Sequence, residues 1–191
     1  KISLGLGQLT ATTTLKRAAG VFVGTVQTAN YYNLEYNGSS KTTGDEFSGT
    51  GLRSLAVNLN PGDTLYLNSD KTISQYLYLT SGKINTGAYT LIHADMTDGS
   101  IFGASPNSYV IGKFRRYISP GMSDYTFPVG GTAYSPVKLS FSVSDGGQIT
   151  ISTTNADNTN ISSSSLNRFR TVNRSWNLNI DAGLFNYTYD A

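Results

Sequence analysis

A two-residue alternation of aliphatic side chains, from about residue 51 to residue 118, places the tightest constraint on the fold. Period two puts every second side chain on one face of a β-strand, whereas a helix needs a period near 3.6. Turn sequences interrupt the alternation at short intervals, as between consecutive strands. The aliphatic positions are Leu55, Val57, Leu59, Leu65, Leu67, Leu77, Leu79, Ile84 and Leu91. We therefore expect short strands with one buried face.

The spacing of these strands indicates how they stack. The pair Leu55 and Val57 recurs as Leu77 and Leu79, twenty-two residues later. One turn of a parallel β-helix takes about 20–25 residues, within the range of solenoid repeats. The spacing predicts a short β-helix-like, β-rich domain over residues 1–118. An antiparallel meander of the same strands is the alternative.

The last third of the chain has a different pattern. Val137, Leu139, Phe141 and Val143 alternate with polar residues, and Gly146-Gly147 then predicts a turn into Ile149 and Ile151. A strand pair with one buried face and one solvent-exposed face is typical of an antiparallel hairpin. Trp176, Leu178 and Ile180 share one face of a later strand. We expect an antiparallel β-sandwich-like domain over residues 119–191, truncated at its C-terminal end, and hence an all-β chain.

The composition excludes some classes of partner. Only 14% of residues are charged, and Gly, Ser, Thr and Asn fill the positions between apolar ones, which favours strands and turns over helices. The formal net charge of +2 is too small to favour nucleic acid or an anionic membrane. No apolar run reaches transmembrane length, so we expect no membrane insertion. The missing initial Met and the strand-like C-terminal end predict a piece of a longer polypeptide.

Catalytic and metal-binding patterns are weak. His93 is the sole histidine, and it would share a strand face with Asp95, a pair that a metal could use. The alternative is a surface strand that ends in an acidic turn. Other Asp residues lie in turns, where Asp usually bonds its own backbone. Cysteine is absent, and no Gly-x-Ser-x-Gly elbow is present. We expect no enzyme activity, cofactor or metal.

Tyrosines supply the candidate binding residues. If the leucines of the alternation point inward, then Tyr66, Tyr76 and Tyr78 point outward. Flat aromatic faces stack on sugars, and the hydroxyl group keeps a polar tip. The three tyrosines therefore predict a surface that binds glycans or a partner protein. The alternative is a face covered by the first fifty residues or by a neighbouring domain.

Several motifs, taken in order, resemble a known class of proteins. They are residues 32–39 (YNLEYNGS), 42–47 (TTGDEF), 77–87 (LYLTSGKINTG), 110–116 (VIGKFRR), 125–130 (YTFPVG), 134–137 (YSPV) and 172–178 (VNRSWNL). This set resembles the repetitive regions of large Bacteroidetes cell-surface proteins. Such proteins include type IX-secreted gliding-motility adhesins and surface-filament proteins.

The resemblance implies an extracellular, surface-attached, multidomain parent. It also implies that Thr64, in Asp63-Thr64-Leu65, matches an acceptor pattern for O-glycosylation. We expect a non-catalytic structural or adhesive module, with glycans, other surface proteins or neighbouring domains of the same polypeptide as partners. One alternative is a carbohydrate-binding accessory module of a secreted polysaccharide-degrading enzyme. A fragment of a β-helical lyase or hydrolase is another.

Overall fold

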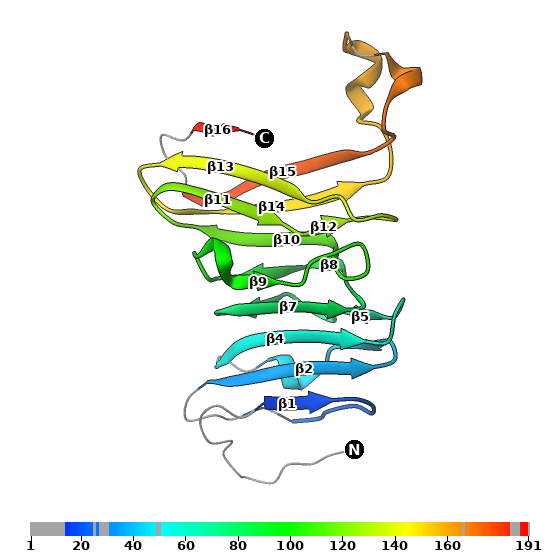
Figure 1. Cartoon of the computed structure of the whole chain (residues 1–191), viewed down its shortest axis with the longest axis vertical. Helices are drawn as coiled ribbons and strands as arrows, with labels where there is room; N and C mark the ends of the chain where they lie inside the picture. The colour runs from blue at the N-terminus through cyan, green and yellow to red at the C-terminus, as the bar shows by residue number, and fades with distance from the viewer. Residues whose placement is uncertain are drawn as a thin grey trace.

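The computed structural model describes residues 14–24, 26, 31–48, 51–165, 167–183 and 188–190, and this part of the chain is all-β. Five parallel strands form what we call the front sheet, which lies nearest the viewer in Figure 1. Its order is β1 (Thr14–Arg17), β2 (Tyr32–Gly38), β4 (Leu52–Leu59), β7 (Tyr76–Ser81) and β9 (Ile101–Phe102). Apart from short 3-10 turns, the described residues contain no helix.

A second sheet, the long sheet, lies behind the front sheet (Figure 1). Its strands are β3 (Lys41–Thr42), β5 (Thr64–Tyr66), β6 (Lys71–Ile73), β8 (Lys83–His93), β10 (Val110–Ile118), β12 (Val129–Gly130), β14 (Gly147–Thr154) and β15 (Ser175–Gly183). Pairing is parallel from β3 through β5 and β8 to β10, and antiparallel from β10 through β14 to β15.

The chain alternates between the two sheets and so winds as a β-solenoid of about five turns. The predicted repeat is confirmed, because Leu55 pairs in register with Leu77, and Val57 with Leu79. The parallel pairing excludes the meander for these strands. Ser81 and Gly82 form the corner between β7 and β8. Gly82 has φ +82, and a Cβ there would lie 2.7 Å from Cβ of Leu59, so the corner requires glycine.

The interior of the solenoid is filled by rows of stacked aliphatic side chains. Strands in register place equivalent inward residues one above the other. All nine aliphatic residues predicted from the alternation are buried. In the front sheet one row runs through Leu34, Leu55 and Leu77, and in the long sheet another runs through Leu65, Ile84 and Val110. The prediction of strands with one buried face is confirmed.

Strand β10 joins the solenoid to the last part of the chain, because it pairs with β8 on one side and with β14 on the other. A cap sheet of antiparallel strands follows: β11 (Gly121–Phe127), β13 (Val137–Val143) and β16 (Thr188–Asp190). The hairpin predicted from β13 to β14 is wrong. The two strands enter different sheets, because β13 pairs with β11 and β16 while β14 pairs with β10 and β15.

One hydrophobic core extends from the solenoid into the residues after 118. Phe114 of β10 lies in register between Leu91 of β8 and Ile151 of β14, and all three are fully buried. The division into domains 1–118 and 119–191, and the sandwich-like nature of the second, stay predictions. The described residues contain no helix with the length and apolarity that crossing a bilayer requires.

Candidate functional site

Two rows of outward-facing side chains cross the front sheet from strand to strand. Parallel strands in register lie about 4.8 Å apart, so outward residues on neighbouring strands are direct neighbours. The first row consists of Thr14, Asn33, Ser54 and Tyr76. The second row consists of Lys16, Glu35, Ala56, Tyr78 and Phe102. Each row therefore runs from polar, charged or small residues to aromatic ones.

The small side chains on β4 leave a groove in this face, which we call the β4 groove. Ser54 and Ala56 lie at its floor, between the tyrosines of β7 on one side and Asn33 and Glu35 of β2 on the other. Its volume is about 330 Å³. Small-molecule sites typically measure about 300–1,000 Å³, so the groove is large enough to hold a ligand.

Aromatic rings form the wall of the groove on the β7 side. Tyr78 and Phe102 stack with ring centroids 5.1 Å apart and planes 16° apart. Tyr76 lies 6.2 Å from Tyr78 and 6.1 Å from Phe102, with tilted planes. One face of the Tyr78 ring packs on Phe102, so its other face is turned toward the position of Ala56, where the side chain is too short to cover it. Phe102 fixes the orientation of this ring.

The structure brings together two of the three tyrosines singled out from the sequence. Tyr76 and Tyr78 belong to the aromatic cluster, whereas Tyr66 lies on β5 in the long sheet, between Thr42 and Asn85. Phe102 was missed because β9 has only two residues and shows no alternation. Its signal is the repeat, since it lies twenty-four residues after Tyr78 and pairs with it.

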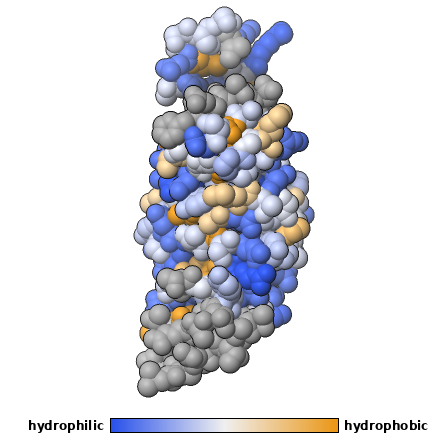
Figure 2. All heavy atoms as spheres, turned by 90° about the vertical axis from the view of Figure 1, so that its left-hand side faces the viewer, coloured by the Kyte–Doolittle hydropathy of each residue, from blue (hydrophilic) through white to orange (hydrophobic). Residues whose placement is uncertain are grey.

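The aromatic rings of the front sheet are partly open to solvent. Tyr78 is 38% exposed and Phe102 is 42% exposed, so the described part of the first fifty residues does not cover them. Cover by a neighbouring domain stays an alternative. Figure 2 shows the side of the molecule at which β2 and β4 begin, where hydrophilic and apolar side chains are interspersed.

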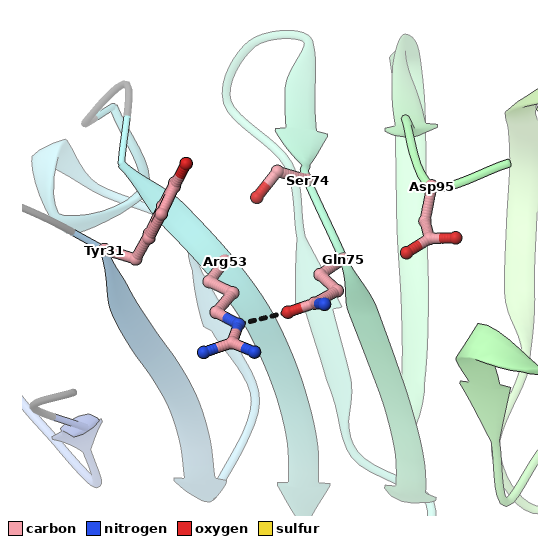
Figure 3. Close-up of a pocket in the computed structure, with 5 residues that line it drawn as sticks. All are labelled: Tyr31, Arg53, Ser74, Gln75 and Asp95. Carbon is pink, nitrogen blue, oxygen red and sulfur yellow. Dashed lines mark hydrogen bonds between the residues drawn. The ribbon is translucent and has the colours of Figure 1, made fainter. Parts of the chain in front are cut away.

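A second cavity of about 410 Å³ lies at this side of the molecule, and we call it the corner cavity. Its lining residues are Tyr31, Arg53, Ser74, Gln75 and Asp95 (Figure 3). Arg53 donates from Nε to the side-chain Oε1 of Gln75. The backbone N–H of Gln75 donates to the backbone carbonyl of Arg53 at 2.8 Å. The side-chain bond to Gln75 orients the guanidinium, and Arg53 also lines the β4 groove.

His93 and Asp95 do not share a face, contrary to the sequence expectation. His93 ends β8 with its ring fully buried, while Asp95 lies beyond the strand and lines the corner cavity. His93 Nε2 lies 2.8 Å from the Gln75 carbonyl oxygen and Nδ1 has no partner. Burial, and to a smaller extent the charge of Arg116, lower the pKa of His93 to about 4. The described residues contain no group of three His, Cys, Asp or Glu side chains that could hold a metal.

Thr64, the residue expected to accept a glycan, is half-buried on β5. Its N–H donates to Ser40 Oγ at 2.9 Å, and the Ser40 hydroxyl donates to Asp63 at 2.5 Å. This arrangement orders the Asp63-Thr64 pair at a corner of the solenoid, and its glycosylation stays a prediction. Comparisons of the chain with protein-family models, with curated proteins and with solved structures find no match.

Proposed function

We propose that this chain is a non-catalytic structural or adhesive module of a secreted bacterial cell-surface protein, and that the β4 groove is its glycan-binding site. The observation that carries the proposal is the Tyr78 ring, stacked on Phe102 and lining the groove beside the short side chain of Ala56. An aromatic face with polar groups around it is a surface on which a sugar ring stacks while its hydroxyls find hydrogen-bond partners.

The groove offers both kinds of contact. Tyr78 supplies the apolar face, and stacking on Phe102 orders the ring before any ligand arrives, which lowers the entropic cost of binding. Ser54 on the floor and Asn33 on the opposite wall supply uncharged hydrogen-bond donors and acceptors. The rigid solenoid holds these groups at fixed spacing, and repeated weak contacts of this kind suit adhesion.

Substitution of the groove tests the proposal by affinity gel electrophoresis in a panel of polysaccharides. In such a gel a bound polysaccharide retards the migration of the protein. We expect the double variant Tyr76→Ser/Tyr78→Ser to weaken this retardation about ten-fold or more, because aromatic anchors dominate binding. We expect the same of Ala56→Phe, because a ring at position 56 would cover Tyr78. Tyr66→Ser and Asn58→Phe are the matched controls, since they lie outside the groove. Retardation that survives both groove variants would contradict the site. Lost folding stability in Tyr76→Ser/Tyr78→Ser, with unchanged retardation, would instead favour the covered face.

The parent protein and its location are part of the same proposal. The ordered motifs from residue 32 to residue 178 resemble repetitive regions of Bacteroidetes surface proteins, and that resemblance supports an extracellular position. Brief protease treatment of intact cells tests it, since a surface-displayed chain is cut while cytoplasmic markers survive. A chain protected until the cells are lysed would contradict surface display.

The second candidate function is a carbohydrate-binding accessory module of a secreted polysaccharide-degrading enzyme. The same groove favours it, because such a module also needs an aromatic face beside polar groups. The full-length parent sequence separates the two candidates. Tandem copies of this unit would favour the adhesive module, and a hydrolase domain in the same polypeptide would favour the accessory module.

A further inference from the structure

The β4 groove and the corner cavity meet at one residue. Arg53 lines both, and it lies three positions before Ala56 on the same strand. At about 3.3 Å per residue, the path from Ala56 to Arg53 covers about 10 Å along β4. The corner cavity then extends past Gln75 to Asp95 (Figure 3). The combined path is longer than one sugar ring.

Arg53 lies on this path, because it lines both cavities. Its Nε is held by Gln75, and in Figure 3 the dashed line to Gln75 starts at Nε and not at a terminal nitrogen. Within the described residues, no hydrogen bond to those terminal nitrogens is present. A fork of two fixed donors suits two adjacent oxygens of a ligand. Arg53 can therefore bind a ligand at the junction of the two cavities.

The other side chains of the corner cavity complement this fork. Tyr31 is 61% exposed and adds an aromatic face. The carboxylate of Asp95 accepts the Thr97 N–H through Oδ1 at 2.7 Å. The second oxygen of Asp95 can accept a hydrogen bond from a ligand hydroxyl. Aromatic face, donor fork and acceptor together repeat the chemistry of the β4 groove.

The formal charges of the side chains along the two cavities sum to zero. Glu35 lines the groove and pairs with Lys16 at 2.9 Å, while Arg53 and Asp95 both line the corner cavity. Two cations thus face two anions, which gives an acidic polysaccharide no net attraction. Hydroxyl groups can use all of these donors and acceptors. The balance favours an uncharged ligand.

We infer that the β4 groove and the corner cavity form one continuous track for an extended, neutral polysaccharide chain, with Arg53 at the junction. The inference rests on the proposed glycan binding and adds the class of glycan and the second half of its site. A chain that fills both cavities makes contacts that a single sugar unit cannot make, so affinity rises with chain length.

The test compares ligand length, ligand charge and protein variant in one series. Laminarin, xyloglucan and mannan serve as neutral polymers, and alginate and polygalacturonate as acidic ones, in affinity gels. Oligosaccharides of two and six units from the best neutral polymer are then titrated by calorimetry. The variants Arg53→Gln and Tyr31→Ala remove the junction and the far aromatic ring. Lys113→Gln and Tyr66→Ala remove a cation and a tyrosine outside both cavities and are the matched controls.

We expect the six-unit ligand to bind about ten-fold more tightly than the two-unit ligand. Tyr31→Ala should lose about five-fold or more on the long ligand only, and Arg53→Gln should lose about five-fold or more on the long ligand. Equal affinity for the two lengths, or a preference for the acidic polymers, would overturn the inference while leaving glycan binding intact. No binding of any polymer would overturn the proposed function and the inference together. Thermal unfolding of each variant shows that it is folded, and Tyr31, which is mostly exposed, offers a change with little structural cost.

Discussion

His93 shows how the solenoid interior treats a single polar residue. Its Nε2 faces a carbonyl oxygen, which can only accept, so the proton of the neutral ring lies on Nε2. Protonation would place a second N–H on Nδ1, where no partner is available. It would also add a charge close to Arg116, which is fully buried beside it in the ladder. The interior therefore favours the neutral ring.

The free energy of unfolding should fall as the pH is lowered from about 6.5 to about 4. In that window the unfolded chain binds a proton at His93 that the folded chain does not bind, and at about 1.4 kcal/mol per unit the loss is about 3 kcal/mol. Below about pH 4 this residue causes no further change. Urea unfolding across the window measures the effect.

The variant His93→Gln separates this residue from the carboxylates that titrate in the same range. Glutamine keeps an N–H for the Gln75 carbonyl but does not titrate, so the loss on acidification should shrink by about 3 kcal/mol. Equal pH dependence in the two proteins would mean that folding does not change the pKa of His93 and would contradict this prediction.

At the scale of elements, a buried carboxylate ties the first strands together. Glu46 lies in a 3-10 turn, η1 (Asp45–Phe47), and is fully buried. Its Oε1 accepts from Arg17 of β1 at 2.5 Å, from the hydroxyl of Tyr36 of β2 at 2.6 Å and from the N–H of Gly44 at 3.0 Å. Burial raises the pKa of the Tyr36 phenol, and the charge of Glu46 raises it further. The turn thus joins β1 to β2 beyond their ladder.

Removal of the Glu46 carboxylate should destabilise the packing of β1 against β2. Glu46→Ala leaves the Arg17 guanidinium, whose side chain is only 10% exposed, without its charged partner, and we expect a loss of about 3–5 kcal/mol in the free energy of unfolding. Hydrogen exchange should accelerate first in β1. Glu35→Ala is the matched control, because its partner Lys16 is 62% exposed and such pairs contribute about 0–1 kcal/mol. Equal losses in both variants would contradict the role of Glu46.

At the scale of the whole molecule, the continuous core predicts one cooperative unit. Strand β10 is shared by the parallel and antiparallel parts of the long sheet, so neither part can unfold without exposing Phe114. Trp176, the sole tryptophan, reports on β15 because its Nε1 donates to the Ser135 carbonyl. We expect fluorescence and far-ultraviolet circular dichroism to give the same urea midpoint.

The opposite outcome has a clear structural meaning. If the Trp176 signal changed at a lower urea concentration while most of the strand signal remained, residues after 118 would unfold as a domain of their own. That result would support the division drawn from the change in sequence pattern, and it would limit the cooperative unit to the solenoid.

The sequence by itself determined the strand type, the buried positions and the repeat of the solenoid. Alternation is a local property, so Leu55, Val57, Leu77 and Leu79 could be assigned to the interior without knowing their neighbours. The interval between the two pairs also predicted that one pair would stack on the other. Tyr76 and Tyr78 could be placed on the outer face by the same alternation.

Only the tertiary structure decided which outer residues meet. Tyr66 has the same local pattern as Tyr78 but lies on the other sheet, whereas Phe102 reaches Tyr78 through strand pairing. The Gly146-Gly147 sequence predicts a hairpin, yet the strands on its two sides belong to different sheets. The physical reason is that strand partners depend on where the corners fall and on how the sheets pack. Both are set by contacts about twenty residues apart in the chain, which a period of two does not encode.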